Sequence, residues 1–148
     1  MTLTTPTIIP GASHTDHRGT ISFVNDFLFE GVNRFYTIHH PSTSIIRAWQ
    51  GHIQESKYYY PVKGTWLIAW VKMDFSIPED QWIAEHIILK ASDNNLLFLP
   101  PGYANGFRAL ESDSIITGFS VPGKEEETLL RWEPQTWLDW NTMNPKSE

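Results

Sequence analysis

The sequence predicts an all-β protein with the architecture of a sandwich or barrel. Short apolar runs, rich in aromatic and β-branched residues, recur at spacings near ten residues and are separated by Gly and Pro. A helical hydrophobic period is hard to find before Lys124. The chain has 148 residues, 41% of them hydrophobic, which leaves room for one core and little for a second. We therefore expect a single domain over residues 1–148.

The expected strands follow the turn residues along the chain. Gly19, Gly31 and Gly51 bound the first three apolar runs. Gly64 separates two long runs, and we expect these two strands to form a hairpin with a tight turn. After the last strand, residues 124–140 are expected to form a short helical or irregular tail. The expected strands are 21–24, 34–38, 44–49, 57–62, 66–73, 82–89, 95–99, 106–110 and 114–121.

Composition excludes several classes of function. The formal net charge of −6 argues against a duplex-DNA binder, although a local Arg and Lys cluster could still bind phosphate. The absence of Cys excludes disulfides, thiolate catalysis and zinc–thiolate sites. No apolar run approaches the ~20 residues needed to cross a bilayer, and residues 1–12 lack a signal-peptide pattern. We expect a cytoplasmic protein with no nucleic-acid or membrane partner, in which Glu125–Glu127 form a solvated face.

Residues 47–57 are the richest candidate for chemistry. If the strand is extended and turns at Gly51, then Arg47, Trp49 and the residues after the turn can project toward one face. Arg offers a fork of donors for phosphate oxygens, and imidazole suits proton transfer near neutral pH. Arg47, His52 and Lys57 converging on one cavity could therefore bind an anion and move a proton. The alternative is a strand edge with scattered polar residues.

A second segment, residues 97–107, joins a strand end to a turn. Pro101 followed by Gly102 suits the two central positions of a type II turn, and a stretch of small residues then begins the next strand. Taken alone, the segment is best explained as a well-formed turn.

The remaining histidines do not predict a metal site. His14 and His17 have ligand-like spacing but no third ligand nearby, so a surface loop is expected. The His39–His40 pair precedes a proline and is expected at a strand end. His86 alternates with apolar neighbours, as a solvent-facing strand residue does.

The motifs IRAWQGH (46–52) and PPGYANGF (100–107), together with Arg18-Gly19 and Arg34-Phe35-Tyr36, resemble the WxcM-like sugar-nucleotide cupins. These are relatives of the dTDP-4-dehydrorhamnose 3,5-epimerases and of the dTDP-sugar 3,4-ketoisomerases. The resemblance covers about residues 15–137. It implies a double-stranded β-helix (jelly roll) with a short C-terminal tail, a ligand cavity inside the barrel and a homodimer. It also implies a nucleotide-linked 4-keto-6-deoxy sugar as substrate, in deoxysugar or surface-polysaccharide biosynthesis.

Residue by residue, the resemblance implies catalytic roles for His52, Tyr36 and Arg47. His52 matches the second His of the ketoisomerase His-x-His pair, and Tyr36 matches the active-site Tyr of those enzymes. The chain also departs from the relatives. The epimerase base is replaced by Gln50, the His of the Pro-Gly phrase by Asn105, the late Tyr by Ile116 or Phe119, and the late Asp by Glu133-Pro134.

These departures favour one reaction type. Inverting a carbon beside a ketone needs one group to remove a proton and a second group to deliver one to the other face. Moving a carbonyl between C3 and C4 can pass through an enediol, with one base working on one face and donors that stabilise the oxygen. The sequence offers one such base, His52, which fits a 3,4-ketoisomerase better than a 3,5-epimerase.

No cofactor is expected. The metal-binding positions of related cupins read Gln50, His52, Glu55 and Asn105 here, and amide oxygens are poor substitutes for imidazole at a transition metal. A non-catalytic nucleotide-sugar-binding cupin stays open as an alternative, because a fold does not guarantee its relatives' chemistry. The expected substrate-binding residues are Arg18, Trp49, Gln50, Lys57, Tyr58, Tyr103 and Asn105.

Overall fold

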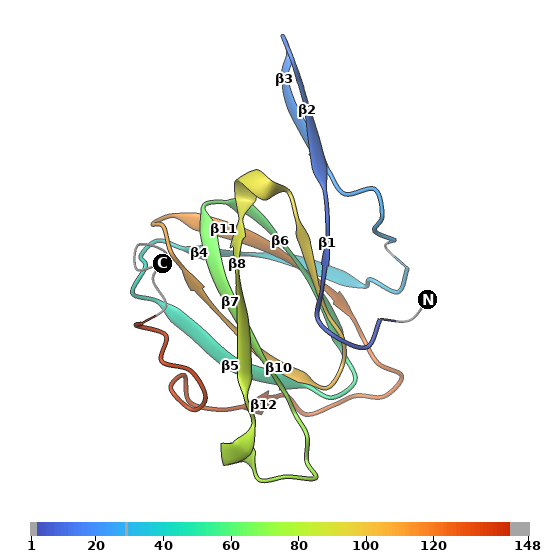
Figure 1. The fold of residues 1–148 in the computed structure, drawn as a ribbon. Coiled ribbons are helices and arrows are strands. Elements are labelled where there is room, and N and C mark those ends of the chain that lie inside the picture. The colour runs from blue at the N-terminus through green and yellow to red at the C-terminus, as the bar shows by residue number, and fades with distance from the viewer. Residues whose placement is uncertain (1–2, 29, 143–148) are drawn as a thin grey trace.

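Two five-stranded antiparallel sheets face each other in the computed structural model, which describes residues 3–28 and 30–142 (Figure 1). The first sheet has the order β1-β9-β6-β11-β4, and the second has the order β12-β5-β10-β7-β8. The prediction of an all-β jelly roll is confirmed. The strands are β1 (Thr7–Ile9), β2 (Ala12–Asp16), β3 (Gly19–Phe23), β4 (Arg34–His40), β5 (Ile46–His52), β6 (Ser56–Lys63), β7 (Thr65–Lys72), β8 (Ala84–Lys90), β9 (Leu96–Leu99), β10 (Tyr103–Ala109), β11 (Ser114–Val121) and β12 (Leu130–Arg131), with 3-10 turns at Glu79–Gln81 and Ala91–Asp93.

Both faces of the second sheet are covered, as the burial of strand β7 shows. Every residue of β7 except the last is buried. Trp66, Ile68 and Trp70 point into the core between the sheets, while Leu67, Ala69 and Val71 point to the outer face. A strand buried on both faces reads as a continuous apolar run, as this one does.

The C-terminal tail covers that outer face. Trp140 is fully buried there and packs near Trp49, and the Trp132 and Trp137 rings lie beside Trp82. The tail is irregular apart from β12, and none of its described residues is helical. Of the two forms expected for residues 124–140, the irregular one is therefore present.

The predicted hairpin between the strands flanking Gly64 is wrong. Strand β6 pairs with β9 and β11, whereas β7 pairs with β8 and β10 in the other sheet. Gly64 has a φ of +83°, so it provides a sharp bend that carries the chain from one sheet to the other. The local turn signal was correct, but it does not specify which strands pair.

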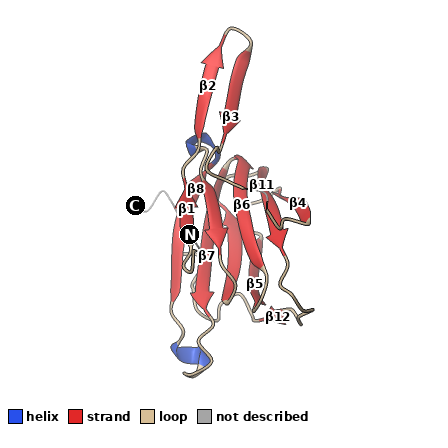
Figure 2. Cartoon of the chain, turned by 90° about the vertical axis from the view of Figure 1, so that its right-hand side faces the viewer, coloured by secondary structure: helices blue, strands red, loops and turns tan. Residues whose placement is uncertain are grey.

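The β2–β3 hairpin extends beyond both five-stranded sheets (Figures 1 and 2). Most of its residues are exposed, His14 and His17 among them. Within the described residues, no helix has the length and hydropathy to cross a membrane.

Candidate functional site

A cavity of about 530 Å³ opens between β4 and β6 of the first sheet and β5 of the second. Its size is typical of a small-molecule site. Residues of the loop after β11 and of β12 complete the wall. The polar and charged residues that line it are Arg34, Tyr36, Thr37, His39, Arg47, Gln50, His52, Glu55, Lys57, Tyr59 and Arg131.

A β-bulge in β5 decides which residues of the segment 47–57 face this cavity. Gln50 lies opposite Asn105 and Arg47 lies opposite Phe107, so two residues of β5 face the single residue Gly106. A Cβ at Gly106 would lie 2.4 Å from the Ala48 Cβ, so only glycine leaves room for the extra residue. The bulge places Arg47, Gln50 and His52 in the wall of one cavity.

The same bulge turns Trp49 away. Its side chain is 1% exposed and packs on the outer face of the sheet against Trp137 and Trp140, and its Nε1 donates to the Pro134 carbonyl. The expectation that Arg47 and Trp49 share a face is therefore wrong. Trp49 cannot stack on a ligand held between the sheets.

His52 is held between two carboxylates. Its Nδ1 lies 3.4 Å from Glu55 Oε2 and 3.7 Å from Glu127 Oε1. Burial, assisted by the charge of Lys57, lowers the pKa of His52 below its ordinary value, although both carboxylates act in the opposite direction. The imidazole is therefore neutral at neutral pH and can accept a proton.

Lys57 is buried in the cavity wall. Its Nζ donates to the Glu55 carboxylate and, over 2.7 Å, to Ser120 Oγ. Burial alone would raise the pKa of Glu55, but the hydrogen bond and charge of Lys57 outweigh burial and lower it. The pair therefore sets an ammonium and a carboxylate beside the imidazole, of which the ammonium lowers the pKa of His52 and the carboxylate raises it.

Tyr36 lies on the opposite wall, among cationic groups. Its ring centroid is 4.8 Å from Arg34 Cζ and 5.5 Å from Lys57 Nζ. Its hydroxyl shares a hydrogen bond with Tyr59, whose own hydroxyl accepts a 3.4 Å hydrogen bond from Asn105 Nδ2. Burial raises the pKa of Tyr59 well above its ordinary value, so this phenol stays protonated.

Four predicted residues do not line the cavity besides Trp49. Tyr58 alternates with Lys57 and Tyr59 along β6, so it faces the other side and packs on Phe27 and Phe98. Tyr103 pairs with His52 in the strand register, and its side chain packs into the core between the sheets. The side chain of Asn105 is buried against the Tyr59 hydroxyl, to which it donates. Arg18 sits at the far end of the β2–β3 hairpin, paired with Asp16 at 2.7 Å.

Sequence reasoning missed several residues of the site. Glu55 falls inside the segment singled out for chemistry, three residues after His52, and that spacing was the available signal. Glu127 was expected in a solvated face, but its carboxylate reaches the turn between β5 and β6. Arg34 belongs to one of the quoted motifs but was given no role there, and neither Tyr59 nor Arg131 was predicted as a site residue. The pairing of distant strands brings all three into the wall.

His52, Glu55 and Glu127 bring three potential metal-ligand atoms within 4.8 Å of one another. Their carboxylates are already engaged, because Glu55 pairs with Lys57 and Glu127 accepts three backbone hydrogen bonds. A lysine ammonium within the cluster also opposes a cation. These residues do not fit a metal centre as they are arranged.

No family model and no curated protein sequence matches the chain. Solved structures do. A dTDP sugar isomerase from Desulfovibrio desulfuricans aligns with a TM-score of 0.79 at 13% identity, over 97% of this chain and 95% of that one. The rmlC epimerase of Mycobacterium tuberculosis aligns with a TM-score of 0.72 at 19% identity, over 91% of this chain and 74% of that one. A 3,4-ketoisomerase from Helicobacter canadensis aligns with a TM-score of 0.67 at 16% identity, over 86% and 90%. The chain thus shares its fold with sugar-nucleotide epimerases and isomerases, from which its sequence is far diverged.

Proposed function

We propose that the protein is an isomerase that acts on a dTDP-linked 4-keto-6-deoxy sugar, by proton transfer through an enediolate in the manner of a 3,4-ketoisomerase. The observation that carries the proposal is the neutral imidazole of His52 in the wall of a cavity that also holds Arg47, Lys57 and Tyr36. The solved structures of the same fold include a dTDP sugar isomerase, a 3,4-ketoisomerase in complex with TDP-4-keto-6-deoxyglucose and an epimerase in complex with dTDP-4-keto-L-rhamnose.

The proposed reaction balances on one base. His52 removes the proton from C3 of the 4-keto sugar, and the electron pair of that C–H bond forms the C3–C4 double bond of an enediolate, with negative charge on O4. The hydroxyl proton of O3 passes to O4 with the help of Tyr36. The proton on His52 then returns to C4, which leaves the carbonyl at C3. Lys57 and Arg47 stabilise the enediolate oxygen by their charge.

The 3,5-epimerase alternative needs a second proton carrier on the other face of the sugar. Ile116, one of the two positions aligned with the epimerase Tyr, is fully buried in the apolar core. Phe119, the other, packs on Phe27 and Phe35. Neither side chain can donate a proton, which favours the ketoisomerase reaction.

Incubation with dTDP-4-keto-6-deoxyglucose in deuterated water tests the proposal. We expect a new 3-keto product, and His52→Ala should abolish both product and exchange while nucleotide affinity is retained. His86→Ala is the matched control, because His86 is exposed on β8 away from the cavity. Deuterium at C3 and C5 without a 3-keto product would instead identify an epimerase. Binding without any exchange would identify a non-catalytic nucleotide-sugar-binding protein.

We further propose that no metal is required. Activity should survive exhaustive chelation, with elemental analysis confirming that the protein is metal-free. Loss of turnover on chelation, restored by one divalent ion, would contradict this.

We also propose that the protein is a homodimer. Strand β4 is an edge of the first sheet and exposes 72% of Phe35, while the β2–β3 hairpin extends past its own sheets. Strand exchange between two copies would cover such edges. It would also give Arg18, which is 75% exposed and remote from its own cavity, a route to the diphosphate in the other copy.

Light scattering should give twice the chain mass, and Arg18→Ala should weaken dTDP binding without changing that mass. A monomer in solution would remove both proposals. A cytoplasmic role in supplying deoxysugars for surface polysaccharide is the setting that we propose for this activity.

A further inference from the structure

The carboxylate of Glu127 is bound by three consecutive backbone N–H groups. Oε2 accepts from Ile53 N at 2.6 Å and from Gln54 N at 2.9 Å, while Oε1 accepts from Glu55 N at 2.9 Å. These three residues form the turn between β5 and β6. Successive N–H groups that converge in this way form an anion-binding concavity. Here the anion is supplied by the chain itself, from a residue more than 70 positions away.

Two further contacts hold the loop that contains Glu127, residues 122–129, against this turn. Gln54 Oε1 accepts a 3.2 Å hydrogen bond from Glu125 N. A Cβ at Gly123 would lie 2.3 Å from the Gln54 Cβ, so the backbone of the loop approaches Gln54 more closely than another residue would allow. The loop then continues into Leu129 and Arg131, which line the cavity. Glu127 therefore joins the end of β5, the strand that bears His52, to the loop that leads into the cavity wall.

This junction lies beside the imidazole. Glu127 Oε1 is 3.7 Å from His52 Nδ1, on the side of the ring opposite Nε2. Glu55 Oε2 is nearer, at 3.4 Å, while the other oxygen of that carboxylate accepts from Lys57, so both carboxylates face Nδ1. An acceptor at Nδ1 favours the tautomer with its proton on Nδ1 and leaves Nε2 as the basic nitrogen. The groups that surround the ring are thus two carboxylates, Glu55 and Glu127, and one ammonium, Lys57.

We propose that Glu127 is a positioning residue, which fixes the turn after β5 and holds His52 in the Nδ1-protonated tautomer so that Nε2 serves as the base. This rests on the proposed function for its consequence in turnover. The tautomer itself is a property of the free protein.

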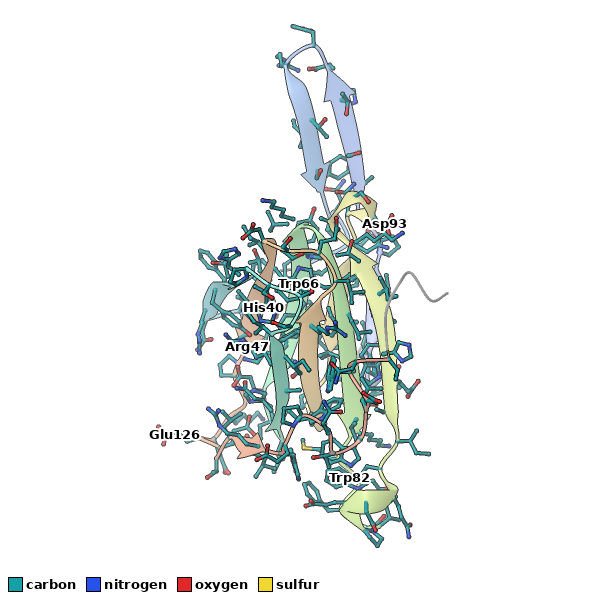
Figure 3. The ribbon with its side chains drawn as sticks, turned by 90° about the vertical axis from the view of Figure 1, so that its left-hand side faces the viewer. His40, Arg47, Trp66, Trp82, Asp93 and Glu126 are labelled. Atoms are coloured by element: carbon teal, nitrogen blue, oxygen red, sulfur yellow. The ribbon has the colours of Figure 1, made fainter. Side chains whose placement is uncertain are left out.

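The first test needs no substrate. In wild-type protein labelled with ¹⁵N-histidine, the His52 ring should show the chemical shifts of the Nδ1-protonated form. Glu127→Gln should reduce the population of that form and move the pKa of His52 further down, because a nearby negative charge is lost. Glu126→Gln is the matched control: it removes the same charge from the adjacent residue, which is exposed and points away from the sandwich (Figure 3).

The second test is kinetic. Glu127→Gln should lower kcat about 10-fold to 100-fold with little change in KM, the range found when the outer partner of a metal-ligating histidine is altered. Glu127→Asp, which keeps the charge, should recover part of that loss. Glu126→Gln should leave kcat unchanged.

A wild-type His52 protonated on Nε2, or a folded Glu127→Gln protein with unchanged ring shifts, would overturn the proposal. The first of these outcomes is decisive even if the variant fails to fold, because it needs only the wild-type spectrum. Absence of any sugar-nucleotide turnover would remove the proposed function and leave the tautomer result standing, so the two failures are distinguishable.

Discussion

The ring of Tyr36 lies directly over Gly118 on the neighbouring strand. A Cβ at Gly118 would come 2.5 Å from Tyr36 Cζ and 2.8 Å from its hydroxyl oxygen. Strands β4 and β11 pair these two residues in register. Glycine at this position of β11 is therefore what lets the phenol lie against the sheet, with its hydroxyl beside Tyr59.

Gly118→Ala should displace the Tyr36 hydroxyl and lower kcat. We expect a loss of about 10-fold in kcat. This is smaller than the roughly 10²–10⁴ that is lost when an acid–base group is removed outright. Tyr36→Phe should give a loss at least as large, and the double variant should be no worse than Tyr36→Phe alone. Thr117→Ala, the adjacent residue on the other face of β11, is the control and should retain kcat. Independent, additive losses in the double variant would show that Gly118 acts by some route other than Tyr36.

The segment 47–57 shows how far the sequence could predict this site. Residue types alone were enough to bring Arg47, His52 and Lys57 together as candidates, and all three line one cavity. The faces of Arg47 and Trp49 could not be predicted, because the bulge depends on the register of β5 against β10. A register is set by residues of both strands, and the turn chemistry of one strand does not encode it.

The predicted solvated face at Glu127 and the predicted hairpin at Gly64 are wrong for the same physical reason. Three consecutive glutamates are usually solvated, and nothing near Glu127 in sequence indicates the N–H groups of residues 53–55 that bind it. Gly64 correctly predicts a turn, yet the partners of the flanking strands come from β8–β11. Patterns of alternation predict strands well, whereas long-range pairing depends on the whole chain.

Removing the charge of Lys57 should shift the pH dependence of activity. Burial is the main cause of the lowered pKa of His52, and the Lys57 ammonium lowers it further. In Lys57→Met this contribution is lost and Glu55 is left unpaired, and both changes raise the pKa of His52. Because the base must be neutral to accept a proton, the acid limb of kcat/KM should move to higher pH.

Lys63→Met, at the exposed end of the same strand, is the control for this measurement and should leave the limb in place. A limb that moves to lower pH in Lys57→Met, or stays where it is, would show that His52 is not the group titrating in that profile.

His40 should make the fold sensitive to mild acid. It is buried against Trp66, with 4.9 Å between ring centroids, and within the described chain neither of its ring nitrogens has a hydrogen-bond partner (Figure 3). Burial, and then the charges of Arg47 and His39, lower its pKa in the folded state. The unfolded chain takes up the proton at the ordinary pKa of 6.5, before the folded chain does.

The stability of the native state should therefore be full above pH 6.5 and fall as pH decreases toward the lowered folded pKa. His52 contributes in the same direction, so His40→Leu should reduce this pH dependence without abolishing it. Urea titrations between pH 7.5 and 5 measure the slope. An unchanged slope in His40→Leu would mean that His40 is protonated in the folded protein as readily as in the unfolded chain.

The C-terminal tail should prove to be part of the core. Trp140 is fully buried on the outer face of the second sheet, its Nε1 donates to the Pro134 carbonyl at 2.8 Å, and its carbonyl accepts from Arg108 at 2.6 Å. Trp140→Ala should lower the free energy of unfolding by about 3–5 kcal/mol, the usual cost of a large aromatic cavity. Ile83→Ala, at a side chain that is 80% exposed, should change it by less than about 0.5 kcal/mol. Because Trp140 also contacts Trp49 behind the bulge, the variant should lower activity too, as the strand bearing Arg47 and His52 loosens. Equal stabilities of Trp140→Ala and wild type in urea titration would show that the tail is only a surface cover.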